Sequence, residues 1–159
     1  MYSASRQIEI DAAHRVPRHG SKCRQVHGHR YVIDAVVEAE EVYESGEQQG
    51  MAMDFGFMKD IMTEVIHDTC DHRLLLYQED PLCELLREVC DKMPAGMLEE
   101  VGLAGIVELP VVPTAENLAQ YWFSQVYTRM TQDIRAQNCR LAQVVVHETP
   151  NCSASYTED

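Results

Sequence analysis

The sequence predicts an α+β domain in which helices cover one face of an antiparallel sheet. Two segments near the N-terminus alternate apolar and polar residues, as strands with one buried face do. Three later segments repeat apolar residues at helical spacing, and strand-like segments return near the C-terminus. Strands that stand before and after a group of helices, rather than alternating with them, are typical of this fold class.

The chain has 159 residues, of which 45% are hydrophobic and 25% are charged. These values predict a single domain over residues 1–159 with a substantial core. No segment is apolar enough to span a bilayer and the N-terminus is too polar for a secretory signal, so we expect a cytoplasmic protein. A net charge of −13 argues against general binding to nucleic acid or anionic membranes. Six cysteines without a C-x-x-C pair predict free thiols.

The two N-terminal strands are expected at about residues 7–14 and 27–40. The first strand ends at His14, which continues its apolar alternation. The second begins with His27 and His29, and both imidazoles share its apolar face because successive strand residues point to opposite faces. Consecutive strands joined by a modest loop usually pair antiparallel. All three histidines are therefore expected at one end of a hairpin.

Three helices are expected in the rest of the chain, and each begins with a capping signal. The N-cap candidates are Asp54, Asp80 and Thr114, and Pro81 takes the first position of the second helix. Apolar residues then recur at intervals of three and four, which gives each helix one face for burial. The segment CDHRLLL is expected to be a connector. Further strands are expected in GIVELP, in RLAQVVVHE and, as a candidate, in the C-terminal tail.

Three histidines at one hairpin end form a candidate metal site. His14, His27 and His29 would supply three neutral imidazoles, which is a typical ligand set of catalytic zinc. Such an ion keeps a coordination position open for water or substrate and lowers the pKa of a bound hydroxyl. The alternative is that each histidine is a buried, hydrogen-bonded residue of its strand. Spacing alone does not decide between these interpretations.

Cys23 lies between Lys22 and Arg24, where a thiolate would be favoured and could accept a proton. The same sulfur could instead be a fourth metal ligand, which would close the site and make it structural. No acid occurs between Asp11 and Asp34, yet this window holds five of the 13 basic residues. These five are Arg15, Arg18, Lys22, Arg24 and Arg30. The basic patch suits a small anionic ligand, and a solvent-facing loop explains it equally well.

Two further groups of residues have both a chemical and a plain structural interpretation. Asp71 and His72 are adjacent, and a carboxylate that orients an imidazole is suited to acid–base chemistry. Glu148 ends an apolar strand, where it is either an exposed terminus or a carboxylate that accepts two N–H groups of a guanidine-like ring edge. Thr114 and Glu116 stand at a helix N-terminus, where capping and the helix dipole explain them without any function.

Taken together, these segments follow the motif order of one known family. The segments are AAHR, KCRQVHGHRY, GMAMDFGFMK, CDHRLLL, PTAENLAQYW and VHETPNCSASY. Over nearly its whole length the chain resembles the 6-pyruvoyl-tetrahydropterin synthase / 6-carboxytetrahydropterin synthase family. The resemblance implies the tunnelling fold, in which sheets of several subunits join into a barrel. It also implies a homohexamer of two trimers with sites at subunit interfaces, which would cover open strand edges.

The resemblance also implies a role for each candidate residue. The implied zinc ligands are His14, His27 and His29. The implied catalytic groups are Cys23 as the base and Asp71 with His72 as a second proton-transfer unit. The implied substrate contacts are Glu148, which would anchor the pterin ring, and Thr114 and Glu116, which would help to line the pocket.

The branch of the family is indicated by the spacing around the cysteine. Three residues separate Cys23 from His27, as in bacterial carboxytetrahydropterin synthases, whereas the pyruvoyl-forming enzymes of animals usually have a longer spacer. A cysteine at this position also argues against the branch that has glutamate there and feeds folate synthesis. The chain departs from compact members in having CDH where a leucine often precedes the DH pair. It also has a longer segment, expected to be a helical and strand insertion, at about residues 82–113.

The activity implied for that branch starts from 7,8-dihydroneopterin triphosphate. Its products are 6-carboxytetrahydropterin, acetaldehyde and triphosphate, on a route to 7-deazapurines such as queuosine. One alternative is a 6-pyruvoyl-tetrahydropterin synthase acting on the same substrate. A second alternative, from another class, is a non-catalytic zinc protein in which Cys23 completes a closed four-ligand site.

Overall fold

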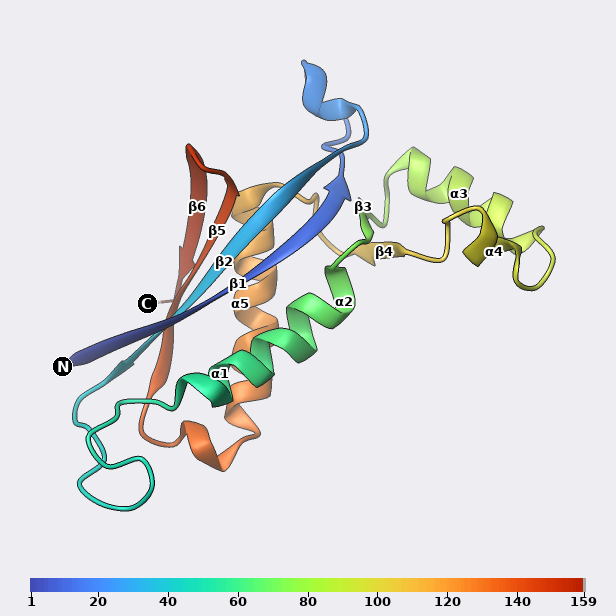
Figure 1. The fold of residues 1–159 in the computed structure, drawn as a ribbon. Helices are drawn as coiled ribbons and strands as arrows, with labels where there is room; N and C mark the ends of the chain where they lie inside the picture. The colour runs from blue at the N-terminus through green and yellow to red at the C-terminus, as the bar shows by residue number, and fades with distance from the viewer. Residues whose placement is uncertain (159) are drawn as a thin grey trace.

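The computed structural model describes residues 1–158, which fold around a six-stranded sheet of order β4-β3-β1-β2-β5-β6 (Figure 1). The four strands β1 (Tyr2–His14), β2 (His27–Ala39), β5 (Arg140–Thr149) and β6 (Cys152–Thr157) pair antiparallel, as expected. At the other edge, β3 (Leu74–Tyr77) runs parallel to β1, and β4 (Ile106–Leu109) runs parallel to β3. The sheet is therefore mixed, with its long strands antiparallel.

Strand β3 corrects one expectation, because CDHRLLL was expected to be only a connector. Leu75 and Leu76 are both fully buried, so this short run has no alternation that would mark it as a strand. Its backbone is held on both sides, since Ala13 N donates to Arg73 O and Leu74 N donates to Gly105 O. Strand β3 thus exists through pairing partners that are distant in the sequence.

The β1–β2 hairpin is the longest pairing in the sheet. Its register runs without a bulge from Tyr2 opposite Ala39 to His14 opposite His27. Every second residue of each strand is the less exposed one, as the alternation predicts, and these residues are buried from Ile10 to His14 in β1 and from Tyr31 to Ala39 in β2. Figure 1 shows α5 (Ala115–Thr131) and α1 (Phe55–Met62) packed on the sheet. A single core cluster contains Ile33 of the hairpin, Met58 of α1 and Trp122 of α5, so these helices cover that buried face.

Capping residues fix the helix starts where the sequence predicts them. The Asp54 carboxylate accepts from Gly56 N at 2.7 Å, and the Thr114 hydroxyl accepts from Asn117 N at 3.3 Å. Helix α1 does not end in a simple turn. It continues through a π-helical turn, η2 (Thr63–His67), into the short α2 (Asp68–Cys70), which delivers the chain to β3.

The segment 82–113 leaves the main body and returns to it. It contains most of α3 (Pro81–Asp91), then α4 (Met97–Glu100) and β4, and Figure 1 shows both helices lying apart from α1 and α5. The apolar stripe expected on α3 is present but mostly uncovered within the chain. Cys83 is the one residue of α3 that is buried, whereas Leu85 and Val89 are exposed. Two short 3₁₀ turns complete the elements, η1 (Lys22–Arg24) and η3 (Ile134–Ala136).

Within residues 1–158, no helix is both long enough and apolar enough to cross a membrane.

Candidate active site

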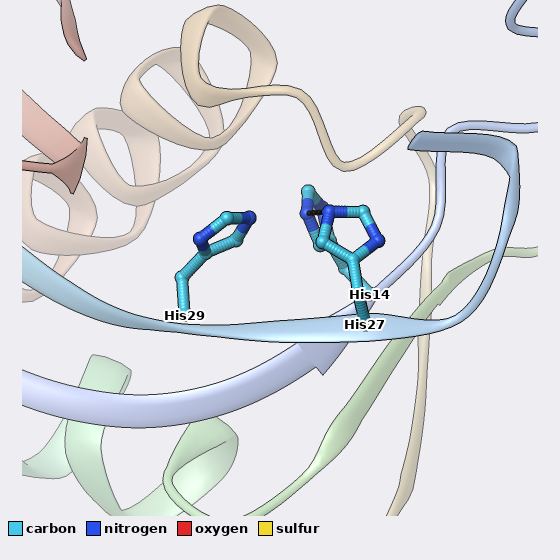
Figure 2. A group of neighbouring side chains, drawn as sticks. All are labelled: His14, His27 and His29. Carbon is cyan, nitrogen blue, oxygen red and sulfur yellow. Dashed lines mark hydrogen bonds between the residues drawn. The ribbon is translucent and has the colours of Figure 1, made fainter. Parts of the chain in front are cut away.

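Three imidazoles converge where the β1–β2 hairpin ends. His14 is the last residue of β1 and faces His27, the first residue of β2, while His29 follows two residues later on the same face. One ring nitrogen of each lies within 4.8 Å of the others, and Nε2 of His14 is 3.1 Å from Nε2 of His27 (Figure 2). The hairpin register therefore brings the three histidines together as the sequence predicts.

The outer nitrogens of two rings are fixed by backbone carbonyls. Nδ1 of His14 donates to Pro113 O at 2.7 Å, and Nδ1 of His27 donates to Gln25 O at 2.8 Å. Each bond selects the tautomer that leaves Nε2 as a lone pair directed at the cluster. Such carbonyl contacts are the usual second partners of metal-binding histidines.

The charge state of the cluster also fits a metal ion. Burial lowers the pKa of His14, and the neighbouring His27 and His29 lower it further. Burial likewise lowers the pKa of His29, whose buried Nε2 forms no hydrogen bond with any described residue. Neutral imidazoles with an unsatisfied inward nitrogen are suited to a divalent cation, because they offer lone pairs and carry no opposing charge. These three histidines are thus positioned to hold a metal ion.

Glu148 points at this cluster from β5. Its Oε1 is 3.5 Å from Nε2 of His14 and 3.9 Å from Nε2 of His29, and 26% of its side chain is exposed. The more ordinary interpretation of Glu148, an exposed strand terminus, therefore does not describe its position. A carboxylate at this distance makes the potential at the cluster more negative, which favours a cation there.

A cavity of about 210 Å³ opens beside His14. It brings together five residues predicted to belong to the site: His14, Cys23, Thr114, Glu116 and Glu148. Cys23 is half-buried and stands on the turn η1 between the two hairpin strands. Cys23 lines the cavity, but its sulfur is not among the atoms that lie within 4.8 Å of one another in the histidine cluster.

His19 and Cys152 also line this cavity, and sequence reasoning did not select either. His19 lies in the irregular loop after β1, where no periodicity predicts its direction. Cys152 reaches the cavity because β6 folds back on β5 so that Thr149 pairs with Cys152. A tight turn between β5 and β6 was the sequence feature that could have predicted the position of Cys152 near Glu148.

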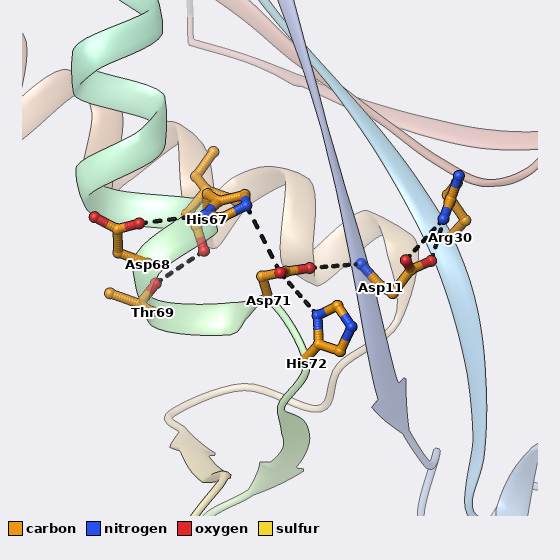
Figure 3. Close-up of polar contacts among 8 residues, drawn as sticks. Asp11, Arg30, His67, Asp68, Thr69, Asp71 and His72 are labelled. Atoms are coloured by element: carbon orange, nitrogen blue, oxygen red, sulfur yellow. Dashed lines mark hydrogen bonds and ion pairs between the residues drawn. The ribbon is translucent and has the colours of Figure 1, made fainter.

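Asp71 and His72 form a carboxylate–imidazole hydrogen bond, but this pair does not lie at the cavity beside His14. Nδ1 of His72 donates to Oδ2 of Asp71 at 2.8 Å, and Asp11 N donates to the other oxygen at 2.9 Å (Figure 3). Burial raises the pKa of Asp71, but these hydrogen bonds outweigh it and hold the pKa below its usual value. His72 lines a separate cavity of about 580 Å³, together with Arg73 and Arg30.

The reason for this separation lies in the pleat of β1. His72 N donates to Asp11 O at 2.7 Å, and the side chain of Asp11 points to the face opposite that of Ala12 and His14. Within one chain, the cavity beside His14 is therefore not lined by the Asp71–His72 pair.

Two of the five residues of the basic patch, Arg15 and Arg30, form ion pairs with acidic residues of the same chain. Nε of Arg15 lies 2.9 Å from the buried carboxylate of Asp80, and Arg30 contacts Asp11 at 2.8 Å through a two-pronged pair. The other three basic residues form no ion pair with any residue in 1–158; they are Arg18, Lys22 and Arg24.

Comparison with known proteins places this geometry in a family. Residues 3–159 match the family model described as 6-pyruvoyl tetrahydropterin synthase. The chain is 32% identical over 152 residues to a protein of Rickettsia conorii named 6-carboxy-5,6,7,8-tetrahydropterin synthase, covering 96% of this chain and 97% of that one. It is 26% identical over 162 residues to the protein of the same name from Haemophilus influenzae, covering 99% and 100% of the two chains.

Solved structures show the same fold. The 6-pyruvoyl tetrahydropterin synthase of Caenorhabditis elegans superposes with a TM-score of 0.63 at 23% identity, over 99% of this chain and 96% of that one. This half-barrel of mixed sheet and helices is the tunnelling fold that the resemblance implied. The match spans nearly every residue of the chain. The structure of the chain brings together the three histidines that the sequence motifs predicted. The chain therefore belongs to the 6-pyruvoyl tetrahydropterin synthase family.

Proposed function

We propose that the protein is a zinc-dependent 6-carboxy-5,6,7,8-tetrahydropterin synthase. It would convert 7,8-dihydroneopterin triphosphate and one water molecule into 6-carboxytetrahydropterin, acetaldehyde and triphosphate, as a step toward 7-deazapurines such as queuosine. The observation that carries the proposal is the cavity in which His14, Cys23 and Glu148 meet. Relatives with this enzyme name, which align with nearly the whole chain, support the choice of branch.

In this proposal the three histidines hold Zn²⁺. Three imidazoles, of which His14 and His27 have outer nitrogens bound to carbonyls, are a ligand set that zinc favours. When bound, the ion supplies Lewis acidity toward hydroxyl groups of the substrate side chain. The chain itself contributes the fixed ring orientations of His14 and His27, which keep the inward lone pairs aligned before any ligand arrives.

In the same proposal, Cys23 would remove a proton from the substrate and Glu148 would orient the substrate. The thiolate of Cys23 would take a proton from the substrate side chain at Sγ. Glu148 would accept two N–H groups of the pterin ring edge, a strong contact because the acceptor is charged. Thr114 and Glu116 form the part of the wall contributed by the start of α5. Their positions around one cavity support these roles.

The second proton-transfer unit, Asp71 with His72, would act in a site completed by a neighbouring subunit. Support comes from the ring of His72, which is 78% exposed and lines a different cavity of its own chain. We propose a homohexamer of two trimers in which the sheets join into a barrel. The free edges of β4 and β6, and the uncovered apolar stripe of α3, are surfaces that such an assembly would cover.

The remaining basic residues of the hairpin loop are candidates for the triphosphate. Arg18, Lys22 and Arg24 are not engaged by acids of the described chain, unlike Arg15. We place the reaction in the cytoplasm, where the six free cysteines would stay reduced.

A product assay tests the proposal directly. Zinc-loaded protein incubated with 7,8-dihydroneopterin triphosphate should release acetaldehyde and yield a pterin whose mass corresponds to a carboxyl side chain. A pyruvoyl side chain would instead identify a 6-pyruvoyl-tetrahydropterin synthase, the activity in the matched family's description. No product of either kind, together with a zinc site that only supports folding, would identify a structural zinc protein.

A further inference from the structure

Asp71 is shared between two imidazoles, and sequence reasoning singled out only one of them. Its Oδ2 accepts from Nδ1 of His72 at 2.8 Å and lies 3.6 Å from Nε2 of His67 (Figure 3). Its Oδ1 accepts from Asp11 N at 2.9 Å. Two hydrogen-bond donors and the more distant Nε2 of His67 therefore surround one carboxylate. We propose that His67 is a positioning residue, which donates from Nε2 to Asp71 and so fixes the oxygen that orients His72.

The need for such a residue follows from the exposure of His72. The ring is 78% exposed, and its hydrogen bond to Asp71 is the one that it makes with the described residues. The backbone of His72 is fixed, because its N–H donates to Asp11 O and its φ is +55°, in the left-handed region. The direction of the ring about its side-chain torsions therefore depends on the rotation of the Asp71 carboxylate.

The helical stretch before Asp71 is built to place His67 beside it. The π-helical turn η2 ends at His67, and single π turns inside α-helices are often found at functional sites. Asp71 N donates to His67 O at 2.9 Å, so the two residues are stacked four apart at the helix end. The Thr69 hydroxyl donates to Val65 O at 2.9 Å, which ties down another carbonyl of this last turn.

His67 has a second carboxylate on its other side. Its Nδ1 lies 3.2 Å from Oδ1 of Asp68, so the ring stands between two acceptors. An imidazolium ring donates to both carboxylates, whereas the neutral tautomer with its proton on Nε2 donates to Asp71 alone. In either form the ring restrains Asp71 from the side away from β1. His67 touches neither the histidine cluster nor the cavity beside His14, so its effect on the reaction would pass through Asp71.

The role assigned to His67 rests on the proposed function, because it presumes that His72 transfers protons in that reaction. The test compares His67→Leu, which keeps bulk but no donor, with His67→Gln, whose amide can donate to Asp71. His67→Leu should lower kcat roughly tenfold with KM changed by less than about twofold, while His67→Gln should keep most of the wild-type kcat. Glu64→Gln is the matched control, because it removes a surface ion pair with Arg129 from the same helical stretch.

A second measurement does not depend on activity. In ¹⁵N-labelled, zinc-loaded protein, the His72 ring should carry its proton on Nδ1, and His67→Leu should produce a mixture of the two tautomers. Wild-type kcat and an unchanged His72 tautomer in His67→Leu would overturn the proposal. Equal losses in His67→Gln, or in Glu64→Gln, would overturn it too, because they would indicate helix damage rather than a lost donor. If the wild-type protein forms no product, the proposed function fails, and the tautomer measurement still decides the role of His67.

Discussion

At the scale of single residues, the candidate site is a set of ordinary side chains placed by backbone contacts. The imidazoles of His14 and His27 are aimed by carbonyl groups, and Asp71 is aimed by the N–H of a neighbouring strand. The residue types and the hairpin register could be read from the sequence. The sequence could not show that Cys23, His19 and Cys152 line the same cavity, because these residues lie in or beside irregular loops and turns. Such segments carry no periodic signal.

The first prediction at this scale concerns Cys23. Replacing it with alanine should lower kcat by at least about a hundredfold, because the proposed base is lost, while zinc content stays at the wild-type level. The measurements are product formation and metal analysis of the same sample. Cys90→Ala, which removes a half-buried thiol of α3, should leave both unchanged. Full activity in Cys23→Ala would reject the thiol as the base, and loss of zinc would assign it to the metal instead.

A second residue-scale prediction concerns pH and the metal-free protein. Burial lowers the pKa of His14 in the folded state, so below about pH 6.5 the unfolded chain binds more protons than the folded one. The free energy of unfolding of chelator-treated protein should therefore fall as the pH is lowered from 7.5 to 5.5. Urea unfolding at several pH values measures this slope. The slope should become shallower in His14→Gln, and an unchanged slope would show that other groups cause it.

At the scale of elements, the periodicity of apolar residues correctly predicted the strands and helices that bury one face. It failed for a strand that is buried on both faces, and it predicted for one helix a buried face that stays uncovered within the chain. The hairpin, α1 and α5 each bury one face, and their patterns are correct in the structure. Strand β3 is buried on both sides, so its leucine run gave no alternation. Helix α3 has a clear apolar stripe, yet much of that stripe has no partner in the chain. An apolar pattern in the sequence shows that one face of a helix is suited to burial, but it does not identify the element or subunit that packs against that face.

The prediction at this scale concerns Asp80, which joins two elements. Its buried carboxylate accepts from Leu82 N at 2.8 Å as the N-cap of α3 and also pairs with Arg15, the residue after β1. Asp80→Ala should lower the free energy of unfolding by about 2–4 kcal/mol, because a cap is lost and Arg15 loses its partner. Asp54→Ala removes a cap without such a pair and should cost about 1 kcal/mol. Urea unfolding of both variants measures the difference, and equal losses would contradict a contribution from the ion pair.

At the scale of the whole molecule, the chain divides its chemical groups between two faces of one sheet. His14 of the histidine cluster lines one cavity together with Cys23, while His72 lines another together with Asp11 and Arg30. The motifs revealed both groups, but the pleat that separates them depends on strand pairing. The proposed assembly accounts for the division, because a neighbouring chain can bring the second group to the first.

The prediction at this scale is complementation between two inactive variants. Cys23→Ala and His72→Ala should each be nearly inactive alone, because each lacks one proposed proton-transfer group. Co-expressed and purified as mixed oligomers, they should regain part of the wild-type activity, since some sites would combine the intact Cys23 of one chain with the intact His72 of another. Light scattering should show a mass near six times the 18.1 kDa chain. Mixed oligomers without activity would place both groups in the same subunit.

The hydrogen bond from His14 to the Pro113 carbonyl joins residues that are 99 positions apart in the chain. Glu148, which completes the polar surroundings of the same imidazole, is delivered by the ribosome later still. A nascent polypeptide that already displays His14, His27 and His29 thus lacks the groups that orient and surround them. Capture of a cation by these rings in their folded geometry must wait until the segments that carry Pro113 and Glu148 have left the ribosome.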